Sequence, residues 1–309
     1  MEIITGVLTA AIRSGTPLLL AAQGELVAEK SGVMNLGLEG LMLIGAIFGF
    51  MVSKISGSPW LGLLAAALAA MLFSLVHAVL AVTMRMNQVI SGLAIVFLGI
   101  GLSTVIGASF VGQSAPAFKP IPLGALSAIP LIGPALFNQD ILVYGSMLLT
   151  PLLAFFIHKT RTGLSLRATG DSPQAADAAG IPVIRLRICA VAFGGMLCGL
   201  GGAYMSLCYT NMWQPAMLGG RGWIALALVI FSGWRPGRAM LGAYLFGGIS
   251  ALQLAMQVSG TSVSSYVLQM LPYLFTILTL SLAMWRAKLA GAGESSVGPA
   301  SLGQPYFRE

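Results

Sequence analysis

Long apolar segments, separated by short polar ones, make up almost the whole chain. Each segment is continuously apolar, and most reach the roughly 17 to 25 residues that a helix needs to cross a bilayer. Transmembrane strands would instead appear as segments of about ten residues with alternating polarity, so the pattern predicts helices. The nine predicted spans are residues 3–24, 36–53, 60–82, 89–111, 141–158, 188–209, 222–234, 238–257 and 266–285.

Two of these spans depart from a simple crossing. Residues 222–234 would cover only about 20 Å at about 1.5 Å per residue, so we expect a re-entrant or interrupted segment there. Arg13 interrupts the first span, which leaves open whether an in-plane helix precedes a shorter insertion. The glycines between Gly194 and Gly202 predict close packing of the 188–209 helix against its neighbours.

The composition agrees with a protein that crosses the membrane several times. Only 8% of the 309 residues are charged, 57% are hydrophobic and the mean hydropathy is +0.90, whereas about a quarter of the residues in a soluble domain are charged. We therefore predict a single all-α integral membrane domain over residues 1–289. The tail, residues 290–309, is rich in Gly, Ser and Pro, and we expect it to be disordered in the cytoplasm.

The distribution of basic residues predicts the orientation. The loop 159–187 contains five Lys and Arg residues, whereas the loop 112–140 contains only Lys119. Basic loops remain in the cytoplasm, so the first loop is predicted to be cytoplasmic and the second external. This orientation places the N-terminus outside and the C-terminus in the cytoplasm, with Lys54 and Arg221 as exceptions on external turns.

The cytoplasmic loop contains the signals of a short helix. Ser172 is a suitable N-cap, Pro173 fits the first helical position, and Gly180 suits the left-handed position after the last turn. A helix over residues 173–179 would carry small residues on one face, namely Ala175, Ala178 and Ala179. Such a face suits docking into a groove of another protein, although an ordinary capped connector would show the same signals.

The stretch "GELVAEKSGVMNLGLEG" places three carboxylates in an apolar region. Glu25, Glu29 and Lys30 fall at the predicted end of the first span, and we interpret them as interfacial charges. Asn35 and Glu39 are four residues apart, hence on one helix face, and polar groups at membrane depth usually face a cavity or a partner. We expect an interrupted segment with both residues on a solute pathway or at a helix interface. A purely structural hydrogen bond between Glu39 and a neighbouring helix is the alternative.

Four motifs, taken in order, make the chain resemble a known family. They are "GELVAEKSGVMNLGLEG", "MRMNQVISGLAIVFL", "GLSLRATGDSPQAADAAGI" and "GGRGWIALALVIFSGWRPG". Together they resemble the permease subunits of ATP-binding-cassette (ABC) importers, within the branched-chain amino acid/simple sugar permease family and, in it, the nucleoside-type branch. Gln88 departs from this likeness, because an acidic residue is expected after the asparagine.

The resemblance implies partners and a location. Such a permease works in a bacterial inner membrane with two cytoplasmic ATPases, an external substrate-binding protein and a second permease subunit, here expected to be a larger homologue. A short cytoplasmic helix of the permease would couple it to the ATPase. The residues to which this coupling role carries over are Asp171, Ser172, Pro173, Ala176, Asp177, Ala179 and Gly180.

The solute is expected to be neutral and polar. Amides and hydroxyls at span ends or within spans suit a nucleoside or a sugar, and no cluster of basic residues at membrane depth suggests an anion. Gln253 and Gln257 are amides of this kind within a span. The candidate pathway residues are Asn35, Glu39, Asn87, Gln88, Ser91, Asn211 and Gln214.

The sequence carries no sign of catalysis. The phosphate-binding pattern G-x-x-x-x-G-K-[ST] is absent, so ATP hydrolysis would reside in partner subunits. His77 and His158 are too scattered for a metal site, and no cofactor is expected. Transport of simple sugars or branched-chain amino acids stays open. An ion-coupled secondary transporter, with Glu39 as its titrating carboxylate, is the alternative of another class.

Overall fold

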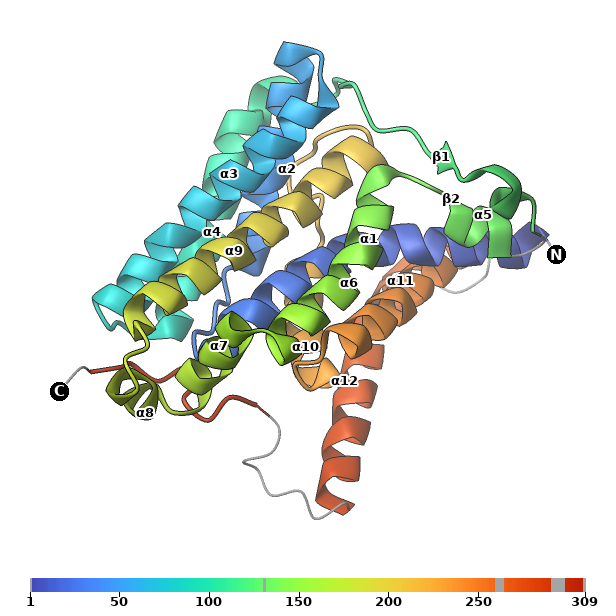
Figure 1. Cartoon of the computed structure of the whole chain (residues 1–309). Helices are drawn as coiled ribbons and strands as arrows, with labels where there is room; N and C mark the ends of the chain where they lie inside the picture. Colours follow the sequence, from blue (N-terminus) through green and yellow to red (C-terminus); the bar gives the residue numbers. More distant parts are fainter. Residues whose placement is uncertain (1, 130–131, 259–263, 290–297, 308–309) are drawn as a thin grey trace.

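Nine long helices make up most of the part of the chain that the computed structural model describes, which is residues 2–129, 132–258, 264–289 and 298–307 (Figure 1). They are α1 (Glu2–Lys30), α2 (Leu38–Ser56), α3 (Pro59–Ala78), α4 (Gln88–Gly107), α6 (Ile141–Lys159), α9 (Val183–Tyr204), α10 (Arg221–Ser232), α11 (Pro236–Val258) and α12 (Ser265–Leu289). Each helix overlaps one predicted span, so the all-α membrane prediction is confirmed. Among the described residues, six helices are long and apolar enough to cross a membrane.

The remaining elements are short. The loop before α6 contains two paired strands and a helical turn, and the loop between α6 and α9 contains two short helices (Figure 1). Short 3₁₀ or π turns also occur, and the π turns extend α3 and α9. These elements are β1 (Ile121–Pro122), β2 (Asn138–Gln139), α5 (Ile132–Phe137), α7 (Arg161–Asp171), α8 (Pro173–Ala178), the 3₁₀ turns Ala108–Phe110 and Gly124–Ala128, and the π turns Val79–Thr83 and Met205–Tyr209.

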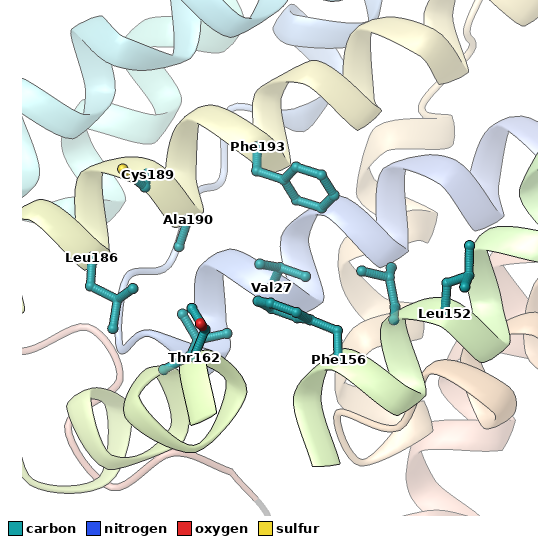
Figure 2. A pocket seen from close by; sticks show the side chains of 10 residues that line it. Val27, Leu152, Phe156, Thr162, Leu186, Cys189, Ala190 and Phe193 are labelled. Atoms are coloured by element: carbon teal, nitrogen blue, oxygen red, sulfur yellow. The ribbon is translucent and has the colours of Figure 1, made fainter. Parts of the chain in front are cut away.

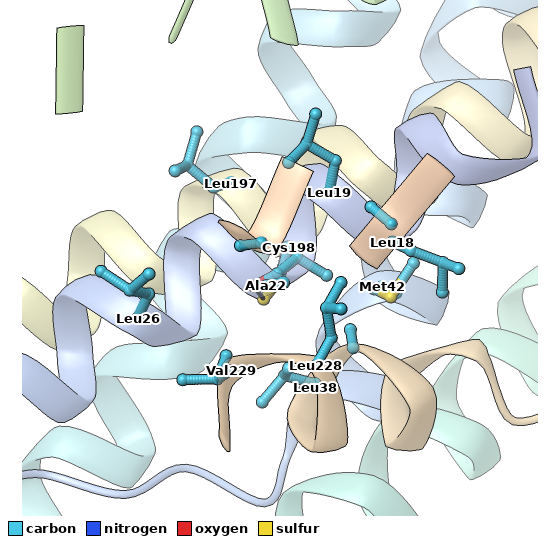
Figure 3. Packing of buried hydrophobic residues seen from close by; sticks show 14 of the residues in the cluster. Leu18, Leu19, Ala22, Leu26, Leu38, Met42, Leu197, Cys198, Leu228 and Val229 are labelled. Atoms are coloured by element: carbon cyan, nitrogen blue, oxygen red, sulfur yellow. Dashed lines mark hydrogen bonds between the residues drawn. The ribbon is translucent and has the colours of Figure 1, made fainter. Parts of the chain in front are cut away.

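Helix α1 is the central helix of the bundle. It packs against α9, α10 and α11. Leu18, Leu19 and Leu26 of α1 are fully buried in one cluster with side chains of α9 and α10 (Figure 3). The helix continues without a break through Arg13, whose guanidinium donates a hydrogen bond to the carbonyl of Cys208 (3.0 Å). The interruption that the sequence left open at Arg13 is therefore absent from α1.

Small residues allow the helices to approach closely. A Cβ atom at Gly199 of α9 would lie 2.5 Å from both the Ala66 carbonyl oxygen and the Ala70 Cβ of α3. A Cβ atom at Gly202 would overlap the carbonyl oxygen of Met42 in α2. Helices in lipid associate through such close packing, because lipid tails are as apolar as the side chains they replace. The packing role predicted for the glycines of this helix is thus confirmed.

The C-terminal segment folds back onto the bundle, where the sequence predicted a disordered tail. Ser301 and Tyr306 are buried, and the backbone N–H of Ser301 donates to the Gly170 carbonyl of α7 (2.9 Å). Gly303 N–H donates to the carbonyl of Gly32 (3.3 Å). For residues 298–307 the prediction was therefore wrong, because individual anchor residues hold a segment that has no apolar periodicity. Residues 290–297 and 308–309 lie outside the described part of the chain.

The close packing of α9 predicts that a Gly→Ala substitution destabilises the protein only where the added methyl group meets a neighbouring helix. We expect Gly202→Ala to destabilise the folded protein by about 1–3 kcal/mol, because the α2 backbone cannot move away without disturbing the bundle. Gly101→Ala in α4 is the matched control, since a Cβ atom there has no heavy atom within 4 Å. Thermal unfolding of both variants in mild detergent checks this. Equal unfolding temperatures for the two variants would contradict the packing described here.

Candidate functional site

The chain between α1 and α2 is an interrupted segment, as predicted, and side chains from three helices satisfy its backbone. Asn35 N–H donates to Oε1 of Glu25 in α1 (2.7 Å). Met34 N–H donates to Oε1 of Gln88 in α4 (2.8 Å), and Nε2 of His77 in α3 donates to the Met34 carbonyl (3.0 Å). Irregular backbone at membrane depth is tolerated only where protein groups or water complete its hydrogen bonds. These side chains therefore hold the break in place.

The orientation of His77 follows from this arrangement. Its Nε2 donates to a carbonyl, so its Nδ1 accepts from the hydroxyl of Ser91, 2.8 Å away. Asn35 closes the segment itself, because its Oδ1 accepts from the N–H of Gly37 (2.8 Å). Ser91 and Asn35, both proposed from sequence as pathway residues, are thus buried and paired within the subunit.

Glu39 holds the start of α10. Its Oε1 accepts from the N–H of Gly220 (3.0 Å) and its Oε2 from the N–H of Gly222 (2.6 Å). The first N–H groups of a helix have no partner inside the helix and carry its positive dipole end, so a carboxylate suits them. Gly222 must be glycine here, because a Cβ atom would lie 2.6 Å from the Cα of Glu39. The two interrupted segments predicted separately therefore bind each other.

The opposite end of α10 is held by a second carboxylate. Trp234 Nε1 donates to Oε2 of Glu29, and Gly233 ends the helix in the left-handed conformation at φ +60°. Glu25 and Glu29 are each only 1% exposed. Their interpretation as interfacial charges was wrong, because α1 continues to Lys30 and faces the break and α10 on the way.

The seven candidate pathway residues do not form one site. Four of them are buried around the break and the start of α10: Asn35, Glu39, Gln88 and Ser91. Asn87 is exposed and caps α4, with Oδ1 accepting from the N–H groups of Val89 and Ile90. Asn211 and Gln214 are exposed in the connection between α9 and α10. A role of this set in transport stays a prediction.

The short helix of the long loop lies where the sequence placed it. α8 begins at Pro173 and ends at Ala178, one residue before the predicted end, and Gly180 has the expected positive φ of +83°. Its exposed residues include Ala175, Ala178 and Ala179, the predicted small-residue face. The other proposed coupling residues divide between exposed Asp171, Ser172 and Gly180, half-buried Asp177, and buried Pro173 and Ala176.

Ala176 faces the subunit itself rather than a partner. It is 3% exposed and packs with Val183 and with Tyr306 of the C-terminal segment. Ala176 therefore supports the helix from beneath, and a direct contact with a partner at this residue stays a prediction that its burial does not favour. Gln174 and the three alanines remain exposed.

Arg187 connects three segments of the subunit near α8. The sequence indicated it only as one of the basic residues of the loop 159–187. It is 1% exposed in the first turns of α9. Its Nε donates to the Ser31 carbonyl (3.0 Å), its Nη2 to Ser301 Oγ (3.1 Å) and its Nη1 to the Gln304 carbonyl (3.4 Å). Ser301 Oγ in turn donates to the carbonyl of Gly170 (2.6 Å). One guanidinium thus connects the break, α7 and the C-terminal segment.

The apolar cavity between α1, α6, α7 and α9 does not suit a polar solute (Figure 2). It measures about 510 Å³. Its walls are mostly apolar, with Val27, Phe156 and Phe193 turned towards its space. Its polar side chains are the Thr162 hydroxyl and the Cys189 thiol. A hydrophilic solute would therefore find few hydrogen-bond partners in it.

These features define a class of protein. Multiple apolar helices, a broken helix pair inside the membrane and a capped helix on a basic loop are typical of a multi-pass transport subunit. Among the described residues no group of three or more His, Cys, Asp or Glu side chains is placed to hold a metal ion.

The sequence profile of the family "Branched-chain amino acid transport system / permease component" matches residues 7–283, and the chain belongs to this family. The family resemblance inferred from the motifs is confirmed. A permease protein of Haloferax volcanii with a provisional glucose assignment is 39% identical over all of this chain and 99% of its own length.

Two further relatives carry nucleoside assignments. The nucleoside ABC transporter permease protein NupC of Lactococcus lactis is 36% identical over 88% of this chain and 90% of its own length. The guanosine ABC transporter permease protein NupQ of Bacillus subtilis is 33% identical over all of this chain and 98% of its own length. The protein is therefore a multi-pass permease subunit of an ABC importer. It is a transport component rather than an enzyme, and ATP hydrolysis belongs to its partner subunits.

The contact between Glu39 and α10 predicts a graded response to substitution. We expect Glu39→Leu to destabilise the protein by roughly 3 kcal/mol, because two N–H groups lose a charged partner at membrane depth. Glu39→Gln should cost less, since an amide oxygen can still accept one of the two bonds. Thermal unfolding in detergent compares them. Equal losses for the two variants would show that the hydrogen bonds are not what Glu39 contributes.

The bonds of Arg187 predict selective release of the C-terminal segment. In Arg187→Met we expect residues 298–307 to exchange backbone hydrogen about tenfold faster, because one lost net bond of roughly 1.4 kcal/mol changes an opening equilibrium by that factor. Arg185→Met is the matched control, since Arg185 is exposed on the same helix. Hydrogen–deuterium exchange measures both variants. Unchanged exchange in Arg187→Met would contradict the role given to the guanidinium.

Proposed function

We propose that the chain moves nucleosides or a related neutral polar solute across the bacterial inner membrane. Partner ATPases would drive it through α8, a second permease subunit would complete the pathway, and an external binding protein would deliver the solute. The nucleoside assignments of two relatives support the solute class. The N-terminus would lie outside and the C-terminus in the cytoplasm, in agreement with the basic residues of the loop around α8.

The observation that carries the proposed coupling is the free face of α8. Ala175, Ala178 and Ala179 are exposed, and small residues allow a partner to approach the helix backbone. The helix is short, but it is supported from beneath by Val183 and Tyr306, so a load on its outer face would pass to α9. Because α9 packs against α1, α2 and α3, movement of α8 would reach the centre of the bundle. Rocking of packed helices is an established form of alternating access.

A second candidate solute is glucose or another simple sugar. The Haloferax volcanii relative, 39% identical over the whole chain, favours it. The description of the family supports branched-chain amino acids as a further candidate solute. The ion-coupled alternative loses its basis, because both oxygens of Glu39 accept backbone hydrogen bonds and the carboxylate serves the start of α10.

The proposed coupling face predicts which substitutions detach the ATPase. We expect Ala178→Arg to abolish recovery of the ATPase with the tagged chain, because a long charged side chain would stand between the two proteins. Gln113→Arg, at an exposed site in the loop before α6, should retain it. Affinity purification from native membranes followed by mass spectrometry gives the result. Recovery of the ATPase with Ala178→Arg at the wild-type ratio would refute coupling through this face.

A further inference from the structure

A polar cavity of about 410 Å³ lies beside the start of α10, between α10, α11 and α12. Six of the ten side chains that line it can form hydrogen bonds, which separates it from the apolar cavity of Figure 2. These six are Tyr209, Arg221, Ser250, Gln253, Gln257 and Tyr273. The sequence indicated Gln253 and Gln257 as amides that suit a neutral polar solute, but none of the six is among the seven candidate pathway residues.

The cavity lies at membrane depth. α10 has 12 residues and ends at Ser232. Trp234, two residues further, is bound to Glu29 near the end of α1. At about 1.5 Å per residue, the start of α10 is roughly 18 Å from that end, about the middle of a hydrocarbon core of about 30 Å. Gln253 and Gln257 lie further along α11, away from the side on which α8 is found. The cavity therefore extends from the middle of the membrane towards the external side.

Among the described residues, one buried polar atom beside the cavity has no hydrogen-bond partner. Nε2 of Gln257 is buried without a hydrogen bond. Tyr273 donates to the carbonyl of Gly219 (2.9 Å), which leaves its oxygen free to accept. Arg221 donates from Nη1 to the carbonyl of Leu218 (3.1 Å) and lies against the ring of Tyr209, 5.7 Å from its centroid. Polar groups at this depth face water or a ligand rather than lipid, so the cavity is built for a hydrophilic occupant.

The charges around the cavity favour a neutral occupant. Arg221 is its only cation among the described lining residues, and the carboxylate of Glu39 is bound to the two residues that flank Arg221. The carboxylate of Glu39 already occupies the N–H groups of Gly220 and Gly222. The start of α10 therefore offers no free anion site, and the positive charge of Arg221 is offset.

Size and shape narrow the solute further. A volume of about 410 Å³ falls in the usual range for small-molecule sites, about 300 to 1,000 Å³. The amides of Gln253 and Gln257 both donate and accept, as the edge of a nucleobase or a ribose hydroxyl requires. The ring of Tyr273 offers a flat face for a heterocycle, whereas Arg221 already covers one face of Tyr209.

We propose that this cavity is a binding site for the solute within the membrane, and that Gln253, Gln257 and Arg221 contact a neutral solute with a flat heterocycle and hydroxyl groups, a nucleoside. The proposal rests on the proposed import function. It adds the place in the subunit at which the solute is recognised after it leaves the external binding protein.

The test is uptake by the intact importer, with its ATPases and binding protein, in proteoliposomes. Radiolabelled uridine and glucose are the probes. We expect the double substitution Gln253→Leu with Gln257→Leu to lower uridine uptake about tenfold or more, because the lost hydrogen bonds selectively weaken binding of a polar solute. The matched control Gln113→Leu should transport like wild type. The ATPase should co-purify with all three proteins, so that a lower rate does not reflect lost assembly.

The outcomes separate the cavity from the solute assignment. Wild-type uptake of uridine by the double variant would overturn the proposed site. If the wild-type importer takes up glucose and not uridine, the nucleoside assignment fails. In that case, a tenfold loss of glucose uptake in the double variant would still place the solute site in this cavity.

A second measurement tests the cavity without any solute. In a Cys189→Ser background we compare Gln253→Cys with Leu252→Cys, a neighbouring exposed position that does not line the cavity. A charged, water-soluble thiol reagent should modify the first thiol in the assembled importer at least tenfold faster than the second. An unreactive thiol in Gln253→Cys would mean that the cavity is closed or filled by protein, and would overturn the proposal.

Discussion

The carboxylate of Glu39 at the start of α10 is the interaction on which the rest of the structure depends. A helix that begins inside a bilayer leaves N–H groups that no water can satisfy. Glu39 satisfies two of them from a helix that itself begins after a break. The break before α2 and the start of α10 therefore stabilise each other, because they lie side by side. Glu29 fixes the far end of α10, and Glu25 fixes the break.

This arrangement joins a closely packed centre to a loop that has few attachments. α1, α2 and α9 pack through glycines that leave no room for displacement, while the free surface of the loop around α8 is held to them by one guanidinium and a C-terminal segment. The proposed coupling would use both features. A partner ATPase would act on the loop around α8, and the packed centre would pass the movement to the other helices.

The sequence predicted the spans well, because a continuous run of about 20 apolar residues is longer than a buried helix of a soluble core usually needs and matches the thickness of a bilayer. It also predicted both interruptions, at residues 31–37 and at α10, from glycines and a short span. It could not predict that they touch, since Glu39 and Gly220 are 181 residues apart and nothing local encodes the contact. Glu25 and Glu29 were misread for a related reason: a charge near a span end indicates an interface only if the helix ends there.

The tail and the polar cavity were missed for different physical reasons. Ser301 and Tyr306 are isolated buried residues within a segment of loop-forming composition. The sequence there has no periodic pattern that would predict their burial. Gln253 and Gln257 were recognised as amides within a span, but Arg221 comes from the first turn of α10 and Tyr209 from the π turn after α9, and only packing brings the four together. Sites assembled from separate elements become visible when packing is known.

Cryo-electron microscopy of the importer in a lipid nanodisc tests the pairing of the two interruptions most directly, because it places α10 relative to the bilayer. We expect α10 to begin near the middle of the bilayer, with the Glu39 side chain against the backbone at Gly220 and Gly222. A map in which α10 continues to the external surface, or in which Glu39 points away from it, would contradict this arrangement.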